Sequence, residues 1–164
     1  MASPLSARAV RFPDGYGASG DARLPWSWVE ERLRPAKNYW LTTVGPDARP
    51  HARPIDGVWV DGALCFGGAP QARWVRNLAT NRAASINLSS EEEAIILEGA
   101  AALVTDASHP LAAASTAASR EKYPQYFAGG ATPFRPFWML RPRTAYAWTL
   151  TDFPRGATRW DFAP

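Results

Sequence analysis

The stretch YWLTTVGPDARPHARPIDGVWVDGALCF, residues 39–66, carries the clearest secondary-structure signal of the chain. Its first part, Tyr39–Val44, is aromatic and β-branched, which is typical of a strand. The following Gly45-Pro46-Asp47 has the composition of a turn. The alternating residues His51–Val60 then predict a second strand, so the two strands are expected to be antiparallel neighbours.

A two-residue hairpin follows, because Asp61-Gly62 is a strong signal for a tight turn between strands. Ala63–Phe66 is the returning strand. The three strands in series predict an antiparallel meander.

The rest of the chain divides into helices and further strands. Helices are expected over Trp26–Arg34, about Gln71–Thr80, and Pro110 to about Tyr123. Strands are expected over Ala83–Leu88, Ala94–Val104 and Phe137–Leu150. Pro142 inside the last strand predicts a bulge or an edge position. About six strands in series with three inserted helices favour a mainly β, α+β fold, an antiparallel barrel with packed helices.

The length of 164 residues suits one domain. Residues 1–24 contain several prolines and glycines and little hydrophobic period, so we expect a flexible N-terminal arm. The alternative is an arm that wraps a partner subunit. Residues 25–164 are expected to form the barrel domain.

Composition and charge exclude several classes of protein. The net charge is +3, and Lys37 and Lys122 are the only lysines, so arginine dominates the positive charge. Arginine favours bidentate recognition of phosphate or carboxylate. The basic residues do not form the stripe that is typical of nucleic-acid binding, so no nucleic-acid partner is expected. Cys65 is alone, so no internal disulfide forms. No signal peptide or membrane-spanning segment is expected, which favours the cytoplasm and no membrane partner.

Common catalytic and metal-binding motifs are missing. The sequence has no phosphate-binding P-loop, no His-Glu-x-x-His and no Cys-x-x-Cys. His51 and His109 are far apart in sequence, so we predict no metal site. No acid–base residue is assigned.

The first candidate site is Gly67–Leu78, where a strand ends in two glycines and a helix begins. Ala69, the expected capping position, has no side chain able to bond the free N–H groups of a helix start. A phosphate would satisfy these donors, and Arg73 and Asn77 share a helix face, with Arg76 close by. The alternative is a plain helix with a water-capped end.

The second candidate site is the segment Pro50–Asp56. Alternation places His51, Arg53 and Ile55 on one face of the strand. Arg53 is therefore either exposed to solvent or paired with an anion. Pro54 indicates that this strand lies at a sheet edge. The flat ring of a ligand could lie against the backbone of such an edge strand.

Eight tryptophans are present, among them Trp148 and Trp160 near the C-terminal end. In a dimer, the partner subunit could complete a binding site there. A tryptophan either stacks on a flavin or fills a core.

Four segments together resemble one known family. They are Leu41–His51 and Gly57–Phe66 as its two hairpins, Arg73–Asn81 as its helix, and Ile95–Ala101 as its strand with a Glu-Gly pair. The pattern is similar to the pyridoxamine 5′-phosphate oxidase-like proteins, and most similar to their flavin/deazaflavin oxidoreductase branch in actinobacteria.

This resemblance implies a six-stranded split β-barrel and a homodimer with two cofactor sites at the interface. It implies coenzyme F-420 or FMN as the cofactor and hydride transfer to a small unsaturated or carbonyl substrate. The cofactor-binding residues so implied are His51, Arg53, Pro54, Ile55, Gly68, Gln71, Arg73, Trp74, Asn77 and Arg159.

The sequence departs from the family pattern at the phosphate grip. Relatives place a lysine where this chain has Trp74, and a hydroxyl or basic residue near Ala72. Phosphate binding would then depend on Arg73, Gln71 and Arg53. Three interpretations follow: an enzyme using deazaflavin, an FMN-dependent oxidase or reductase, and a relative that binds a cofactor without catalysis or has none.

Overall fold

The computed structural model describes residues 3–17, 20–130 and 134–163. In these residues it has nine strands and three α-helices, with two short 3₁₀ helices. The strands are β1 (Ser6–Ala9), β2 (Tyr39–Val44), β3 (Pro50–Ile55), β4 (Val58–Val60), β5 (Ala63–Phe66), β6 (Ala83–Ser89), β7 (Glu93–Val104), β8 (Phe137–Thr149) and β9 (Thr158–Asp161). The helices are α1 (Trp26–Leu33), α2 (Arg73–Thr80), α3 (Pro110–Lys122), η1 (Pro124–Phe127) and η2 (Leu150–Asp152).

All strands are antiparallel to their neighbours, in the order β1-β9-β8-β7-β6-β2-β3, with β5 on β8 and β4 on β5. The long strand β8 closes the barrel, because its first part pairs with β5 and its second part with β9. Between these parts the β7–β8 register shifts at Glu98/Gly99, opposite Pro142, which confirms the predicted irregularity. A Cβ at Gly99 would lie 2.5 Å from the Arg141 carbonyl oxygen, so glycine is required there.

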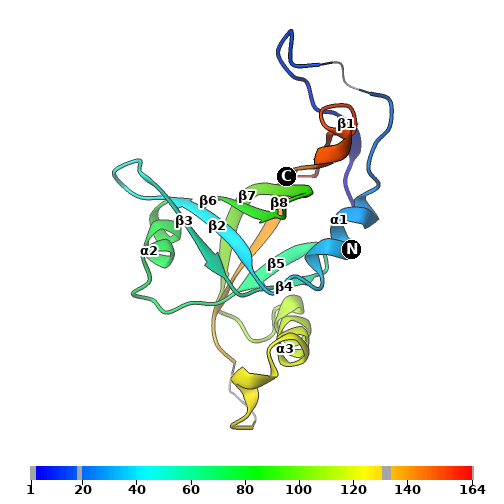
Figure 1. Cartoon of the computed structure of the whole chain (residues 1–164). Helices are drawn as coiled ribbons and strands as arrows, with labels where there is room; N and C mark the ends of the chain where they lie inside the picture. Colours follow the sequence, from blue (N-terminus) through cyan, green and yellow to red (C-terminus); the bar gives the residue numbers. More distant parts are fainter. Residues whose placement is uncertain (1–2, 18–19, 131–133, 164) are drawn as a thin grey trace.

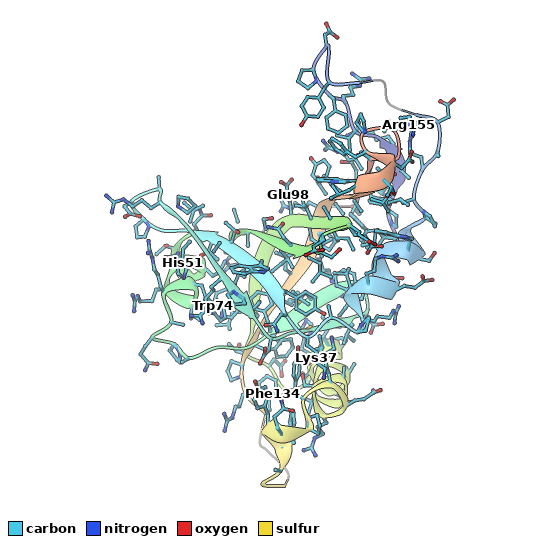
Figure 2. The ribbon with its side chains drawn as sticks, viewed as in Figure 1. Lys37, His51, Trp74, Glu98, Phe134 and Arg155 are labelled. Atoms are coloured by element: carbon cyan, nitrogen blue, oxygen red, sulfur yellow. The ribbon has the colours of Figure 1, made fainter. Side chains whose placement is uncertain are left out.

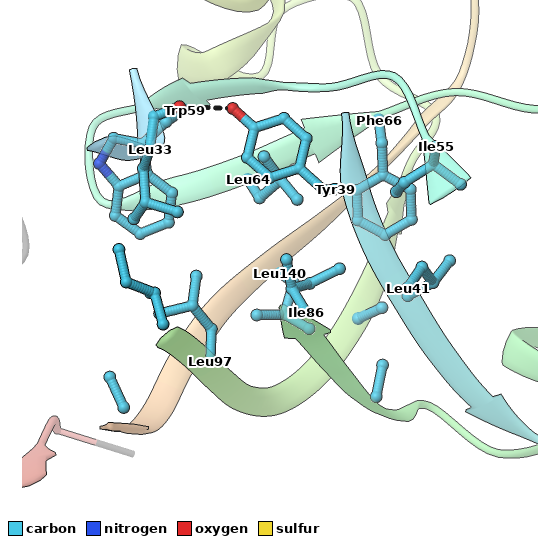
Figure 3. Close-up of a cluster of buried hydrophobic side chains, with 14 of the residues drawn as sticks. Leu33, Tyr39, Leu41, Ile55, Trp59, Leu64, Phe66, Ile86, Leu97 and Leu140 are labelled. Carbon is cyan, nitrogen blue, oxygen red and sulfur yellow. Dashed lines mark hydrogen bonds between the residues drawn. The ribbon is translucent and has the colours of Figure 1, made fainter. Parts of the chain in front are cut away.

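The core fills the barrel with side chains from the inward positions of the strands (Figure 3). Leu41, Leu64, Ile86, Leu97 and Leu140 are all fully buried. The hydroxyl of Tyr39 donates to the Leu33 carbonyl at 2.5 Å and so joins β2 to the end of α1. The mainly β barrel with packed helices predicted from alternation is confirmed.

The helices lie at different ends of the barrel (Figure 1). Helix α2 lies beside β2 and β3, whereas α3 packs on β4. Strand β1 and η2 belong to a lobe that projects at the opposite end from α3. No helix in the described ranges is long and apolar enough to cross a membrane.

The structure corrects three sequence predictions. The single strand expected over residues 51–60 is two strands, because the N–H and C=O of Gly57 bond to the Tyr123 hydroxyl instead of a neighbouring strand. Helix α2 begins at Arg73, two residues later than expected. Strands β1 and β9 were not predicted; they pair with each other, so part of the N-terminal arm is ordered against the sheet.

Candidate functional site

His51 on β3 lies beside α2, with its Nε2 atom buried and without a hydrogen-bond partner in the described structure. Desolvation lowers the pKa of His51 below its ordinary value, and the positive charges of Arg73 and Arg53 lower it further. The neutral imidazole therefore faces two guanidinium groups. We call His51, Arg53 and Arg73 the α2 cluster; Figure 2 labels His51 beside α2.

The start of α2 adds backbone donors to this cluster. Its N-cap is Ala72, which has extended backbone and makes no side-chain cap. Ala69, the expected cap, lies outside the helix, and its carbonyl accepts from the Ala72 N–H at 2.9 Å. The first helical bond is from the Arg76 N–H to the Ala72 carbonyl, so three N–H groups, residues 73–75, have no partner among the described residues.

The charges of the cluster are not compensated. Arg53 and Arg73 form no ion pair with any described carboxylate, whereas Arg49 pairs with Asp47 nearby. Gln71 is exposed, and its carbonyl accepts from the Arg76 guanidinium at 2.7 Å. The Arg53 Nε donates to the Pro54 carbonyl at 3.4 Å. Free N–H groups, two guanidiniums without ion pairs in the described structure and an unpartnered imidazole nitrogen suit a bound phosphate.

Three of the predicted binding residues, Ile55, Trp74 and Asn77, are buried beneath this surface, and a fourth, the exposed Gly68, packs over one of them. Trp74 is 3% exposed and packs on Phe66, and a Cβ at Gly68 would lie 2.1 Å from its ring. Asn77 is also buried and donates from Nδ2 to the Thr43 hydroxyl at 3.0 Å. Ile55 is in the core. These contacts fix α2 on the barrel, and Gly68 is needed there for the tryptophan ring.

The last two predicted residues lie on the outer face of the sheet. Pro54 is exposed and pairs with Trp40 across β2 and β3. Arg159 on β9 bonds to the Asp161 carboxylate at 2.8 Å and lies over the Tyr146 ring. Four strands separate β9 from β3 along the sheet, so Arg159 is not brought to the α2 cluster within one chain.

The outer face of the sheet carries apolar side chains around Trp40, and the exposed Glu98 of β7 lies on the same face. Trp40 is 48% exposed, and the strand register places Ile96, Tyr146 and Trp148 on the same face. Trp40 and Ile96 line a hollow of about 330 Å³. Trp148 therefore lies on this surface, whereas Trp160 is 1% exposed and belongs to the core.

A larger cavity of about 720 Å³ lies between β4, β5, α3 and η1. Sequence reasoning missed it, because its walls come from segments that are distant in sequence and meet only in the fold. In the described residues no group of three or more His, Cys, Asp or Glu side chains is placed to hold a metal ion.

A family model described as pyridoxamine 5′-phosphate oxidase matches residues 28–149. No curated protein matches the chain. Among solved structures, a conserved hypothetical protein of Mycobacterium tuberculosis has a TM-score of 0.65 at 17% identity, covering 79% of this chain and 87% of its own.

Two further solved structures share the fold. A pyridoxamine 5′-phosphate oxidase-related, FMN-binding protein of Nostoc punctiforme has a TM-score of 0.57 at 19% identity, covering 86% of this chain and 98% of its own. The heme storage protein HutZ of Vibrio cholerae has a TM-score of 0.58 at 22% identity, covering 73% of this chain and 90% of its own.

Proposed function

The chain belongs to the pyridoxamine 5′-phosphate oxidase family, and from this premise we propose that the α2 cluster binds the phosphate of a flavin-type cofactor. The observation that carries the proposal is the buried, unpartnered Nε2 of His51, whose pKa is lowered by the charges of Arg73 and Arg53, two arginines without carboxylate partners in the described structure. A buried polar atom without a partner is costly, and a ligand oxygen or N–H would remove that cost.

Coenzyme F-420 is the cofactor that we favour over FMN. Both carry phosphate, but the acidic tail of F-420 offers more negative charge to an arginine-rich surface. Arg53 and Arg73 are free of ion pairs with described residues, and Arg76 lies on the exposed side of the same helix. More anionic groups on the ligand use more of these charges.

Trp74 does not occupy the proposed phosphate site, although it replaces the lysine of relatives. Its ring points into the core beneath Gly68. The site therefore lacks one positive charge but is not blocked. Arg73 and the helix N-terminus supply the attraction instead.

We propose an oxidoreductase that transfers a hydride to a small unsaturated or carbonyl substrate. The bound cofactor supplies the hydride chemistry, and the protein supplies binding and electrostatics. Arg53 and Arg73 hold the anionic end, and the neutral His51 donates or accepts one hydrogen bond there. The exposed backbone near Pro54 at the sheet edge gives the flat ring a surface to lie on.

The proposal includes a homodimer formed through the outer sheet face. That face carries aromatic and aliphatic side chains with uncharged neighbours such as Thr42 and Asn87. A two-fold interface brings a patch against the same patch of its copy, where the apolar side chains around Trp40 would be buried. The partner is also the means by which an Arg159 side chain would reach an α2 cluster.

A fluorescence titration with F-420, run beside FMN, tests the cofactor. We expect micromolar binding, tighter for F-420, and a loss of about tenfold or more in the Arg73→Ala variant, because one charge-assisted contact is removed. Arg49→Ala, which removes an exposed arginine paired to Asp47, is the matched control and should bind normally. An unchanged affinity in Arg73→Ala would place the phosphate elsewhere.

The titration also separates the alternatives. Binding of FMN alone favours an FMN-dependent oxidase or reductase. Binding of either cofactor without turnover of any substrate favours a cofactor-binding relative. Binding of neither overturns the proposal and favours a relative without cofactor.

Light scattering tests the dimer. We expect a dimer at micromolar concentration, and a monomer with retained circular dichroism for Ile96→Asp, because a charge would be buried against its own copy. A monomeric wild-type protein would contradict the shared site.

A further inference from the structure

The cavity of about 720 Å³ beside α3 has mainly apolar walls. Its floor comes from β4 and β5, with Val58, Cys65 and Phe66. Burial raises the pKa of the Cys65 thiol to about 12, so this side chain is neutral and adds to the apolar floor. Its volume falls in the range of small-molecule sites, about 300–1,000 Å³.

Aromatic rings form the outer wall. Tyr123 and Tyr126 stack with ring centroids 5.7 Å apart, and Phe134 packs edge-on against Phe137 at 6.3 Å. Figure 2 shows Phe134 at the α3 end of the molecule, away from His51, which lies on the side of α2. Such rings bind a flat apolar body.

Most polar side chains of the cavity are bonded within the protein. Ser115 and Thr116 both donate to the Ala112 carbonyl, and the Tyr126 hydroxyl donates to Asp56 at 2.6 Å. The Tyr123 hydroxyl bonds to the backbone of Gly57. These groups therefore have little capacity left for a ligand.

The cationic side chains of the lining are Arg120 and Arg135, and both are exposed. Neither guanidinium forms a hydrogen bond or an ion pair with a described residue, although Arg120 lies 5.0 Å over the Phe127 ring. Asp56 is the sole acidic side chain in the described lining, and Tyr126 already occupies its carboxylate. The cavity thus combines an apolar interior with unpaired positive charge.

We propose that this cavity is a second binding site, for a flat aromatic molecule that carries one anionic group. The rings and strand residues enclose the apolar body, and Arg120 and Arg135 bind the anion in planar, bidentate fashion. The site has no residue in common with the α2 cluster, so it binds its ligand whether or not a flavin-type cofactor is present.

Calorimetric titration of the full-length protein with 2-naphthoate and with 2-naphthamide tests the proposal. The two probes have the same shape and differ in charge. We expect naphthoate to bind about tenfold more tightly, because a hydrogen bond to a charged group adds that much. The double variant Arg120→Met and Arg135→Met should lose this preference and keep the affinity for naphthamide.

Three variants locate the site. Ala113→Trp, at an exposed lining position of α3, should abolish binding of both probes, and Arg143→Met should leave it unchanged. Arg73→Ala should also leave it unchanged, which separates this site from the proposed cofactor site. Equal affinity of the two probes overturns the proposal, as does loss of binding in Arg73→Ala alone. Absence of binding to a folded wild type also overturns it, and indicates that a partner copy fills the cavity.

Discussion

The two histidines of the chain lie beside the starts of two helices, and they differ in one respect. At α3, His109 is the N-cap, and its Nδ1 accepts from the Leu111 N–H at 3.2 Å. At α2, His51 faces the helix from β3, and its buried Nε2 has no partner in the described structure. The imidazole of His109 caps a helix, whereas the Nε2 of His51 makes no hydrogen bond with the described residues and is available to a ligand in our proposal.

The same difference extends along both helices. At its C-terminal end, α3 is tied to the barrel by Lys122, which donates to Tyr39, and by Tyr123, which bonds to Gly57. Helix α2 is held by Trp74 and Asn77 from below, while its N-terminal donors and Arg73 stay unsatisfied. Buried polar groups are usually paired in proteins, so the buried, unpartnered Nε2 of His51 is what leads us to propose a ligand here.

The largest loss of stability is expected from a substitution that disturbs the packing beneath α2. In Gly68→Ala the new Cβ would lie 2.1 Å from the Trp74 ring. The ring must shift, so the free energy of unfolding should fall by about 3 kcal/mol, the upper end for overpacking. Urea unfolding measures the change.

Gly67→Ala is the matched control, because no atom lies within 4 Å of the added Cβ. Its free energy of unfolding should change by less than about 0.5 kcal/mol. Equal losses in both variants would mean that backbone flexibility, not the Trp74 ring, requires glycine here.

A smaller effect is expected at the α3 tether. In the wild type the Gly57 N–H donates to the Tyr123 hydroxyl at 3.0 Å, and Tyr123→Phe removes this acceptor. A buried unsatisfied donor costs about 2 kcal/mol, so the free energy of unfolding should fall by that amount. Tyr126→Phe, whose exposed hydroxyl bonds to Asp56, should cost less than about 1 kcal/mol. A larger loss for Tyr126→Phe would reverse the assigned roles.

The smallest effect is a pH dependence at Lys122. Burial lowers the pKa of its ammonium from 10.5 to about 8. The unfolded chain therefore holds this proton more tightly between these values, and the free energy of unfolding rises with pH in that window. From about pH 8 to about pH 9.5 the wild type should gain more stability than Lys122→Met. Parallel curves for the two proteins would show that Lys122 does not titrate there.

The fold was largely readable from local pattern. Alternation and turn residues define the strands from Tyr39 to Phe66, and Asp61-Gly62 forms its turn with positive φ at both residues. Strand β1 was missed because four mostly exposed residues carry no hydrophobic period, and their strand form depends on pairing with β9. The break at Gly57 was missed because its bonding partner, Tyr123, is 66 residues away.

The site was readable only in part. Residue types pointed to His51, Arg53 and Arg73. In the structure the charges of both arginines lower the pKa of His51. No local signal distinguishes Trp74 in the core from a tryptophan on a cofactor, because both are aromatic residues near a helix start. The orphaned nitrogen of His51 and the cavity beside α3 are properties of the folded chain alone.

The titration of His51, followed by NMR of the imidazole with and without FMN or F-420, tests the central claim most directly. In the free protein its pKa lies below the ordinary 6.5. A phosphate bound by Arg53 and Arg73 places negative charge beside the imidazole and favours its protonated form, so the pKa should rise. The signals of His109, capping α3, should not respond to the ligand. Cofactor binding that leaves the His51 titration curve in place would contradict the account.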